Sequence, residues 1–247
     1  MGRFVLLSGP SCVGKGPLLR ALSKLYPETT EKLQKVVLYN GRERRPCEVD
    51  DVDYHFIKNI QGLPDSDYIK MEIRKGNWQA LKLSDITSVV QSGKIGFLEV
   101  FHKLGALAKN HPVLNGLIES GDVCTVFLSP LSMEEIQLLK SKAADLPAVV
   151  ADIMRRKLLR RTTRQKGILS LKDLEDIEKR CSTAYGELQS ASDYRYVLVN
   201  HDGEDSDNWE QFPLPIGDAE KSVHTFAEIL EGKQSIVYQQ WPVGLLP

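Results

Sequence analysis

The sequence has few cysteines, no marked excess of charge of either sign, and no long hydrophobic run. Its four cysteines stand singly without a C-x-x-C pair, which is typical of a reduced, cytoplasmic protein and does not favour a zinc site. The 32 basic residues balance the 33 acidic ones, which excludes the strong positive charge typical of nucleic-acid and membrane-surface binders. No apolar run approaches the ~20 residues that span a bilayer. We therefore expect a cytoplasmic globular protein with no nucleic-acid partner and no membrane association.

Short apolar runs alternate with helical and polar segments along the chain. Residues 3–8 (RFVLLS) form the first run and are followed by Gly-Pro, and residues 16–26 carry apolar residues at helical spacing. Similar runs recur at 95–100, 123–129 and 194–200. This alternation predicts an α/β fold built on a parallel sheet.

Residues 8–19 (SGPSCVGKGPLL) have the glycine and lysine spacing of a P-loop. In such a loop, glycines let backbone N–H groups surround a phosphate, the following helix adds its positive dipole end, and the lysine reaches the outer phosphates. The predicted strand before the loop and helix after it support this interpretation. The hydroxyl residue that normally serves magnesium is replaced by Gly16, followed by Pro17. We predict a phosphate site with no side-chain metal ligand, at which Mg²⁺ would be held mainly through nucleotide phosphates and water. The predicted contact residues are Gly9, Pro10, Ser11, Cys12, Val13, Gly14, Lys15 and Gly16.

A polar, arginine-rich segment follows at residues 40–56 (NGRERRPCEVDDVDYHF). Its guanidinium and phenol groups are suited to holding a second phosphate by bidentate and hydroxyl hydrogen bonds. The candidate residues for this second phosphate site are Arg42, Arg45, Glu48 and Tyr54.

This segment resembles the guanylate kinase pattern TTR-x-x-R-x-G-E-x-x-G-x-D-Y-x-F, with Cys47 and Asp51 where the family has glycines. Further stretches resemble other motifs of that family. These are GNWQA (76–80), SGKIGFLEV (92–100), KLLRRT…IEKRC (157–181) and VLVN, which ends at Asn200. Together the matches extend roughly from residue 3 to residue 232.

The resemblance implies a three-layer P-loop kinase fold with a parallel sheet core, a monophosphate-binding insert and a lid. The core would comprise 1–37, 89–153 and 181–232, the insert 38–88 and the lid 154–180, leaving 233–247 as a C-terminal tail. The implied reaction is ATP plus GMP or dGMP to ADP plus GDP. The second phosphate site, formed by Arg42, Arg45, Glu48 and Tyr54, would bind the phosphate of the acceptor. Lys15, Arg161 and Arg180 would be catalytic, and Asn200 would lie near the ATP adenine.

The departures from the family pattern concentrate on positions that read the acceptor base. Leu38, Lys70 and Leu81 replace a serine, a glutamate and a hydroxyl residue. Loss of residues that recognise the base changes base specificity more than it weakens phosphate binding. The remaining acceptor-base candidates are Glu72, Gln79 and Glu99. The lid also has about eight more residues between Arg161 and Ile177 than the family usually has, and Lys157 replaces another arginine.

Two alternatives remain open. The acceptor is either GMP or a different phosphorylated molecule, such as another nucleoside monophosphate or a phosphorylated sugar. The chain is either a kinase or a non-catalytic module that grips phosphopeptides, as in scaffold proteins with guanylate kinase-like domains. The acidic segment 202–221 is expected to be an exposed loop before a final helix near 221–232, and the tail shows no clear periodicity. Oligomeric state is not indicated.

Overall fold

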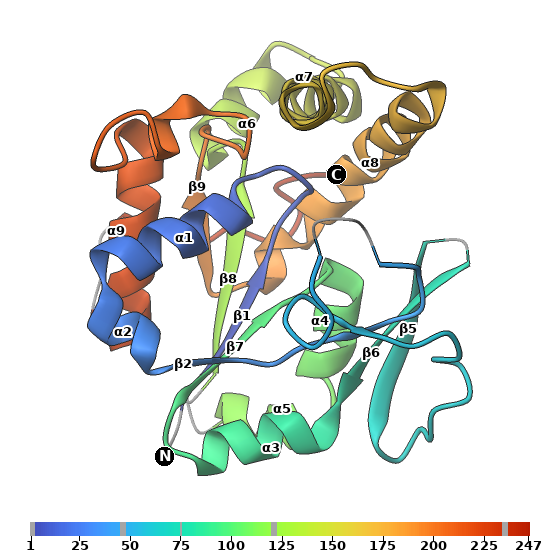
Figure 1. The fold of residues 1–247 in the computed structure, drawn as a ribbon. Helices are drawn as coiled ribbons and strands as arrows, with labels where there is room; N and C mark the ends of the chain where they lie inside the picture. Colours follow the sequence, from blue (N-terminus) through green and yellow to red (C-terminus); the bar gives the residue numbers. More distant parts are fainter. Residues whose placement is uncertain (1–2, 45–47, 75, 120–122, 234–236) are drawn as a thin grey trace. The chain divides into compact units, whose positions relative to one another are not determined.

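The computed structural model describes residues 3–44, 48–74, 76–119, 123–233 and 237–247. Contacts divide the chain into two units, residues 1–7 with 31–124, and residues 8–30 with 125–247. Figure 1 shows both as mixtures of helices and strands. Within the described residues, no helix is both long and apolar enough to cross a bilayer.

The first unit contains three parallel strands in the order β2 (Leu33–Lys35), β7 (Ile95–Glu99) and β1 (Phe4–Ser8). All five residues of β1 are buried, as its unbroken apolar run predicts. Gly96 allows close packing in β7, because a Cβ there would lie 2.4 Å from the Phe4 ring. Helices α3 (Leu83–Gln91), α4 (His102–Lys109) and α5 (Pro112–Glu119) belong to the same unit.

A second sheet in this unit carries most of the predicted insert. Its order is β4 (His55–Phe56), β3 (Tyr39–Asn40), β6 (Asn77–Lys82) and β5 (Tyr68–Arg74). β6 pairs antiparallel with both β3 and β5, while β3 and β4 are parallel. One apolar cluster joins this sheet to the parallel strands and includes Leu6, Leu38, Leu81, Leu98 and Leu104.

The second unit contains the parallel pair β8 (Val123–Ser129) and β9 (Tyr196–Val199). Around it are α1 (Lys15–Leu25), α2 (Pro27–Glu31), α6 (Met133–Ser141) and α9 (Gly217–Glu231), with α1 packed beside α9 (Figure 1). The parallel strands and alternating helices confirm the predicted α/β class, and four of the parallel strands fall in the predicted apolar runs. The short strand β2 was not predicted, because three residues carry too little pattern.

Two long helices, α7 (Leu146–Lys166) and α8 (Leu171–Gln189), form a hairpin that contains the predicted lid, residues 154–180 (Figure 1). Local sequence explains its turn. α7 ends before Gly167, whose φ is 74°, and Ser170 begins α8 with a capping box to Asp173. The residues between Arg161 and Ile177 therefore form the end of α7, the turn and the start of α8.

Part of the C-terminal tail is packed against this hairpin. Trp241, Leu245 and Leu246 are buried in one apolar cluster with residues of α7 and α8. The backbone oxygen of Pro247 accepts hydrogen bonds from Tyr185 and Gln189 of α8. The tail is thus part of the core of the second unit.

The segment before α9 is only partly the exposed loop that its composition predicts, because residues 210–214 are exposed while part of 202–209 is buried. Asp205 and Trp209 are 3% and 5% exposed, a 3-10 helix spans Asp207–Trp209, and α9 begins at Gly217. Acidic residues are usually exposed unless paired, and the pairing here comes from a distant helix, as described below. We call residues 202–211 the acidic loop.

Candidate functional site

The glycine-rich loop leads from β1 into α1, as predicted. Gly9 and Gly14 have φ of 144° and 110°, which L side chains rarely adopt. A Cβ at Gly9 would lie 2.5 Å from the Leu128 carbonyl oxygen, and one at Gly14 would lie 2.5 Å from Asn200 Nδ2. Both positions therefore require glycine for conformation and for close packing.

Lys15 is the first residue of α1 and its side chain curls back over the loop. Its Nζ donates to the carbonyl oxygens of Gly9 at 2.8 Å and Pro10 at 3.0 Å. The residue is 9% exposed, so its positive charge is held in the loop and not spread into solvent. Because an ammonium has three protons, it can exchange carbonyl partners for phosphate oxygens.

Gly16 has room for a side chain. A Cβ there would meet just one atom within 4 Å, Nη1 of Arg20 at 3.7 Å, and its φ is not positive. The magnesium-binding hydroxyl is thus missing through residue type and not through lack of space. The described residues contain no group of three or more His, Cys, Asp or Glu side chains arranged to hold a metal.

Cys12 lies inside the loop with φ of 70°. Burial, reinforced by the nearby carboxylate of Glu204, raises the pKa of its thiol to about 12. The neutral, buried thiol is unsuited to nucleophilic chemistry.

Asn200 follows β9 and is fully buried. Its Nδ2 donates to the carbonyl oxygens of Val13 at 2.7 Å and Asp202 at 2.8 Å. The side chain therefore ties the P-loop to the acidic loop. Its predicted position near the adenine stays a prediction.

The two predicted lid arginines lie on the hairpin, Arg161 on α7 and Arg180 on α8. Arg161 Nη1 donates to Glu204 Oε2 at 2.7 Å. Desolvation lowers the pKa of Arg161, but the combined effect of neighbouring groups, led by the charge of Glu204 and including its hydrogen bond, outweighs it, so the pKa is raised. Arg180 is 9% exposed, and its Nε donates to Asp176 Oδ2 at 2.9 Å. Each guanidinium is therefore held by a carboxylate.

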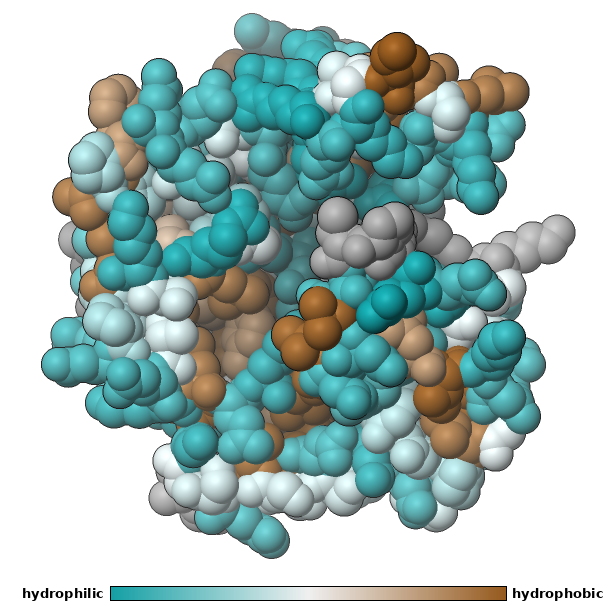
Figure 2. Space-filling view, viewed as in Figure 1, coloured by the Kyte–Doolittle hydropathy of each residue, from teal (hydrophilic) through white to brown (hydrophobic). Residues whose placement is uncertain are grey.

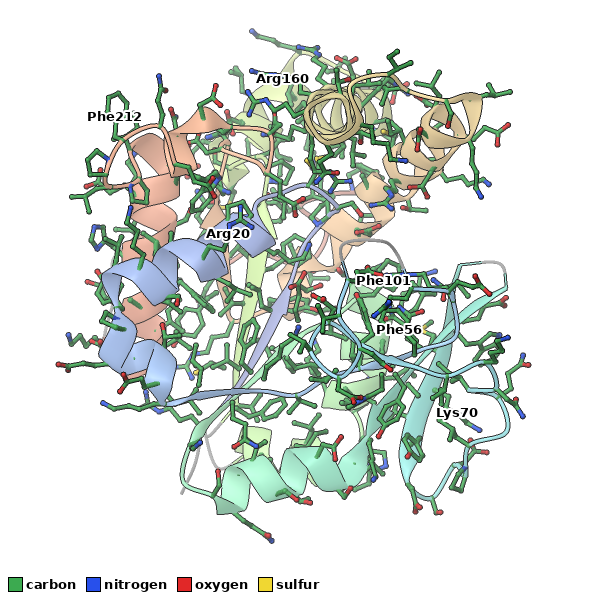
Figure 3. All side chains as sticks on the ribbon, in the orientation of Figure 1. Arg20, Phe56, Lys70, Phe101, Arg160 and Phe212 are labelled. Carbon is green, nitrogen blue, oxygen red and sulfur yellow. The ribbon has the colours of Figure 1, made fainter. Side chains whose placement is uncertain are left out.

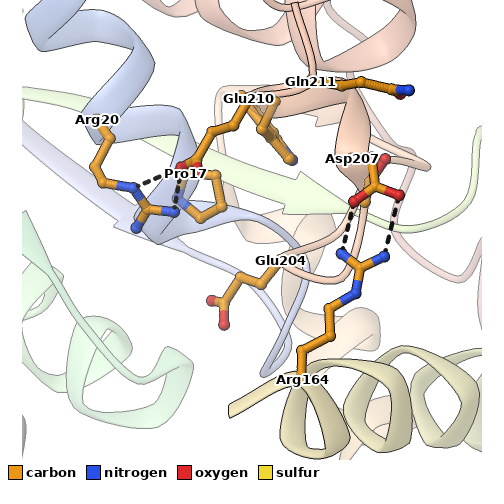
Figure 4. A pocket seen from close by; sticks show the side chains of 9 residues that line it. Pro17, Arg20, Arg164, Glu204, Asp207, Glu210 and Gln211 are labelled. Carbon is orange, nitrogen blue, oxygen red and sulfur yellow. Dashed lines mark hydrogen bonds and ion pairs between the residues drawn. The ribbon is translucent and has the colours of Figure 1, made fainter.

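The acidic loop was not predicted to be part of this region, yet it contacts both the P-loop and α7. It lines an open cavity of about 350 Å³ (Figure 4). In this cavity Arg164 of α7 pairs with Asp207, and Arg20 of α1 pairs with Glu210. The remaining lining residues are Pro17, Glu204, Ser206, Trp209 and Gln211. The abundance of acidic residues in 202–211 and of basic residues in 154–166 was a sequence signal for this contact.

Arg42 anchors the predicted acceptor-phosphate site in the first unit. Its guanidinium forms a two-pronged ion pair with Glu48, whose Oε2 accepts from Nη1 at 2.7 Å. The Arg42 Cζ lies 5.4 Å from the ring centres of both Tyr54 and Phe56, which is cation–π distance. The structure thus brings together three of the four predicted residues, and Arg45 lies outside the described residues.

Beside this group is a small cavity of about 80 Å³, lined by Lys35, Val36, Leu38, Asp53, Tyr54 and Glu99. Glu99, at the end of β7, therefore shares a cavity with Tyr54. Leu38 supplies an apolar wall where the family pattern has a serine.

The acceptor-base candidates on β5 and β6 differ in what their polar atoms do. Glu72 caps the turn between these strands by accepting from the Gly76 N–H at 2.7 Å. Gln79 is 7% exposed, and its Oε1 has no hydrogen-bond partner among the described residues. Asn77 Oδ1, two residues earlier on β6, is likewise buried and unpartnered within the described chain. Asn77 was missed, because an amide in a glycine turn resembles ordinary turn chemistry.

Lys70 is directed away from Gln79. It pairs across the sheet with Ala80, whereas Met71 pairs with Gln79, so the side chains of Lys70 and Gln79 leave opposite faces. The Lys70 ammonium (Figure 3) donates to the Gln61 and Leu63 carbonyl oxygens and pairs with Asp65 at 2.8 Å. The Lys70 side chain therefore stabilises the loop formed by residues 61–65.

The family model described as guanylate kinase matches residues 1–145. A guanylate kinase of Clostridium perfringens (strain 13) is 25% identical over 209 residues, covering 83% of this chain and 79% of that protein. One of Helicobacter pylori (strain 26695) is 26% identical over 209 residues, covering 82% of each. One of Streptococcus agalactiae (strain NEM316) is 30% identical over 165 residues, covering 63% of this chain and 71% of that protein.

A solved structure shares the fold. The crystal structure of guanylate kinase from Anaplasma phagocytophilum superposes with a TM-score of 0.53 at 18% identity, covering 94% of this chain and 85% of that one. At this identity the likeness shows the architecture alone.

Proposed function

The chain belongs to the guanylate kinase family, and from this premise we propose that it transfers the γ-phosphoryl group of ATP to GMP or dGMP, yielding ADP and GDP or dGDP. The observation that carries the proposal is the P-loop. Gly9 and Gly14 adopt backbone conformations that favour glycine, and the Lys15 side chain folds back over the loop. A site for a nucleoside triphosphate needs this arrangement.

Phosphoryl transfer requires in-line phosphates and neutralised charge, and it asks little covalent chemistry of the protein. Lys15 and the loop N–H groups would hold the donor's outer phosphates. Magnesium, when bound, would neutralise charge on the donor phosphates. Arg42 and Tyr54 would hold the acceptor phosphate, and Arg161 and Arg180 would neutralise charge on the group in transfer. An acceptor phosphate oxygen is already ionised, so the reaction needs no general base.

Side-chain amides would bind the acceptor base, in place of the glutamate and hydroxyl residues that the family pattern has and this chain lacks. Gln79 and Asn77 offer buried carbonyl oxygens without partners in the described residues, which favours a ligand with N–H donors. Guanine presents adjacent N–H groups on one edge. Glu99 would add a carboxylate acceptor from the cavity that it shares with Tyr54.

A second acceptor class is favoured by one observation. Lys70 stands where the family pattern has a base-reading glutamate, and its ammonium is engaged by the 61–65 loop. Another nucleoside monophosphate or a phosphorylated sugar would not need that contact. A non-catalytic phosphopeptide module is favoured by the missing hydroxyl at position 16.

The test is ADP formation from ATP and Mg²⁺ with GMP, dGMP, AMP, CMP, UMP and ribose bisphosphate in parallel. Lys15→Ala should abolish turnover, whereas Lys142→Ala, at an exposed position after α6, should not. Turnover with GMP and dGMP alone supports the proposal, and turnover with a different acceptor replaces it by the second class. Binding of ATP or GMP without any turnover would favour the phosphopeptide module.

A further inference from the structure

A row of basic side chains on α7 faces the acidic loop. Lys157, Arg160, Arg161 and Arg164 recur at helical spacing and so lie along one face of the helix. Arg161 pairs with Glu204 at 2.7 Å, Arg160 with Asp205 at 3.5 Å, and Arg164 with Asp207 at 3.0 Å. Lys157 lies 4.0 Å from Asp205. Figure 3 labels Arg160 on α7, and Figure 2 shows predominantly hydrophilic atoms over this part of the surface.

The acidic loop is also fastened to the P-loop. The backbone N–H of Glu204 donates to the Cys12 carbonyl oxygen at 3.1 Å. Trp209 is buried, its Nε1 donates to the Asp202 carbonyl oxygen at 2.7 Å, and its ring would lie 3.2 Å from a Cβ at Gly14. The carboxylates of the loop are therefore presented to α7 from directly beside the predicted phosphate site.

We propose that the acidic loop is an autoinhibitory clasp, whose carboxylates occupy α7 arginines that the donor triphosphate must recruit. The inference rests on the proposed function for the identity of the donor. Carboxylate and phosphate oxygens fit the same guanidinium fork, so one arginine cannot satisfy both fully. Glu204 and Asp207 hold Arg161 and Arg164 in the nucleotide-free protein, and nucleotide binding releases them.

The contact between the acidic loop and α7 leaves some buried polar atoms without hydrogen bonds, which is expected of a contact that a ligand can displace. Nε of Arg161 and Oδ1 of Asp205 are both buried without a hydrogen-bond partner among the described residues. Unpaired buried polar atoms are costly. A phosphate that engages Arg161, with release of the loop to solvent, would satisfy both atoms.

The experiment compares Glu204→Gln, Asp207→Asn and the double variant with the wild type. The matched control is Glu178→Gln on α8. This variant breaks the ion pair with Arg155, which lies on α7 like the arginines of the clasp, and it does not change the acidic loop. Titration calorimetry would measure binding of ATP and of inorganic tripolyphosphate without any acceptor, with circular dichroism to confirm folding. Each single variant should bind both probes ~5-fold more tightly, as expected for losing one partly exposed ion pair, and the control should match the wild type.

Hydrogen exchange supplies a second measurement. Adding ATP to the wild type should speed exchange across residues 203–211, because the loop leaves α7 and the P-loop. Unchanged or weaker binding in the variants, slower exchange of the loop, or no tripolyphosphate binding by any form would overturn the clasp. If the variants bind tripolyphosphate more tightly but no form phosphorylates GMP, the clasp stands and the kinase proposal falls. If the wild type phosphorylates GMP but the variants bind tripolyphosphate no more tightly, the kinase proposal stands and the clasp falls.

Discussion

At the scale of single residues, Gly16 separates phosphate binding from magnesium binding. The loop around it keeps the glycines and lysine that surround a phosphate, while position 16 contributes no oxygen. A Cβ fits at this position, so a hydroxyl residue can be introduced there as a test. The residue therefore offers a direct test of how the protein handles the metal.

We predict that Gly16→Thr lowers the magnesium concentration needed for half-maximal activity several-fold, because its hydroxyl can join the ion's oxygen ligands. Gly16→Ala is the matched control. Alanine improves helix propensity by up to ~1 kcal/mol but adds no oxygen. Magnesium titrations of turnover and thermal melts of both variants would separate the two effects. Equal magnesium shifts in the two variants would contradict the prediction.

At the scale of elements, His201 joins three segments of the second unit. It follows β9, its Nδ1 contacts Asp218 at the start of α9, and its Nε2 lies 2.9 Å from Glu135 in the first turn of α6. Partial burial lowers the pKa of His201, but hydrogen bonds to Glu135 and Asp218 outweigh it, so the pKa is raised. The charged imidazolium is thus the form that holds these elements together.

The raised pKa sets the sign of a pH dependence. In the unfolded chain this histidine titrates near ~6.5. Its contribution to stability is therefore complete below that pH and is lost as pH rises through the higher folded-state value. We predict that the Tm difference between wild type and His201→Gln shrinks steadily from pH 6 to pH 9. His224→Gln, on α9 and paired with Tyr26, serves as the control and should leave the wild-type pH profile in place.

At the scale of the whole molecule, the two halves of the proposed reaction fall in different units. The P-loop, the lid arginines and the acidic loop belong to the second unit, whereas Arg42, Tyr54 and Gln79 belong to the first. Each unit has its own apolar cluster.

We therefore predict that substitutions separate the two substrates. Gln79→Leu should weaken GMP binding ~10-fold, the cost of leaving a polar ligand group unpaired, while ATP affinity stays unchanged. Lys15→Met should weaken ATP binding while GMP affinity stays unchanged. Calorimetric titration of each variant with each nucleotide alone provides the measurement. A Gln79→Leu variant with normal GMP affinity would remove this residue from the acceptor site.

Much of the architecture was predictable because its signals are local. The parallel strands β1, β7, β8 and β9 are short apolar runs, and the P-loop is a contiguous spacing of glycine and lysine. The motif matches in 40–56 and 157–181 indicated the family, and that prediction is confirmed. The site roles assigned from those motifs stay predictions.

The partners in the long-range contacts were not predictable residue by residue, because these contacts join residues far apart in sequence. Glu204 and Arg161 are 43 positions apart, and the tail reaches α8 across 58 to 62 positions. No periodicity records such pairings, since ion pairs and tail packing depend on which surfaces the folded backbone brings together. Local residue patterns thus decided the strands, the phosphate loop and the family. Only the tertiary structure decided that the acidic loop holds arginines of α7, because the energy of an ion pair depends on distance in space and not on separation along the chain.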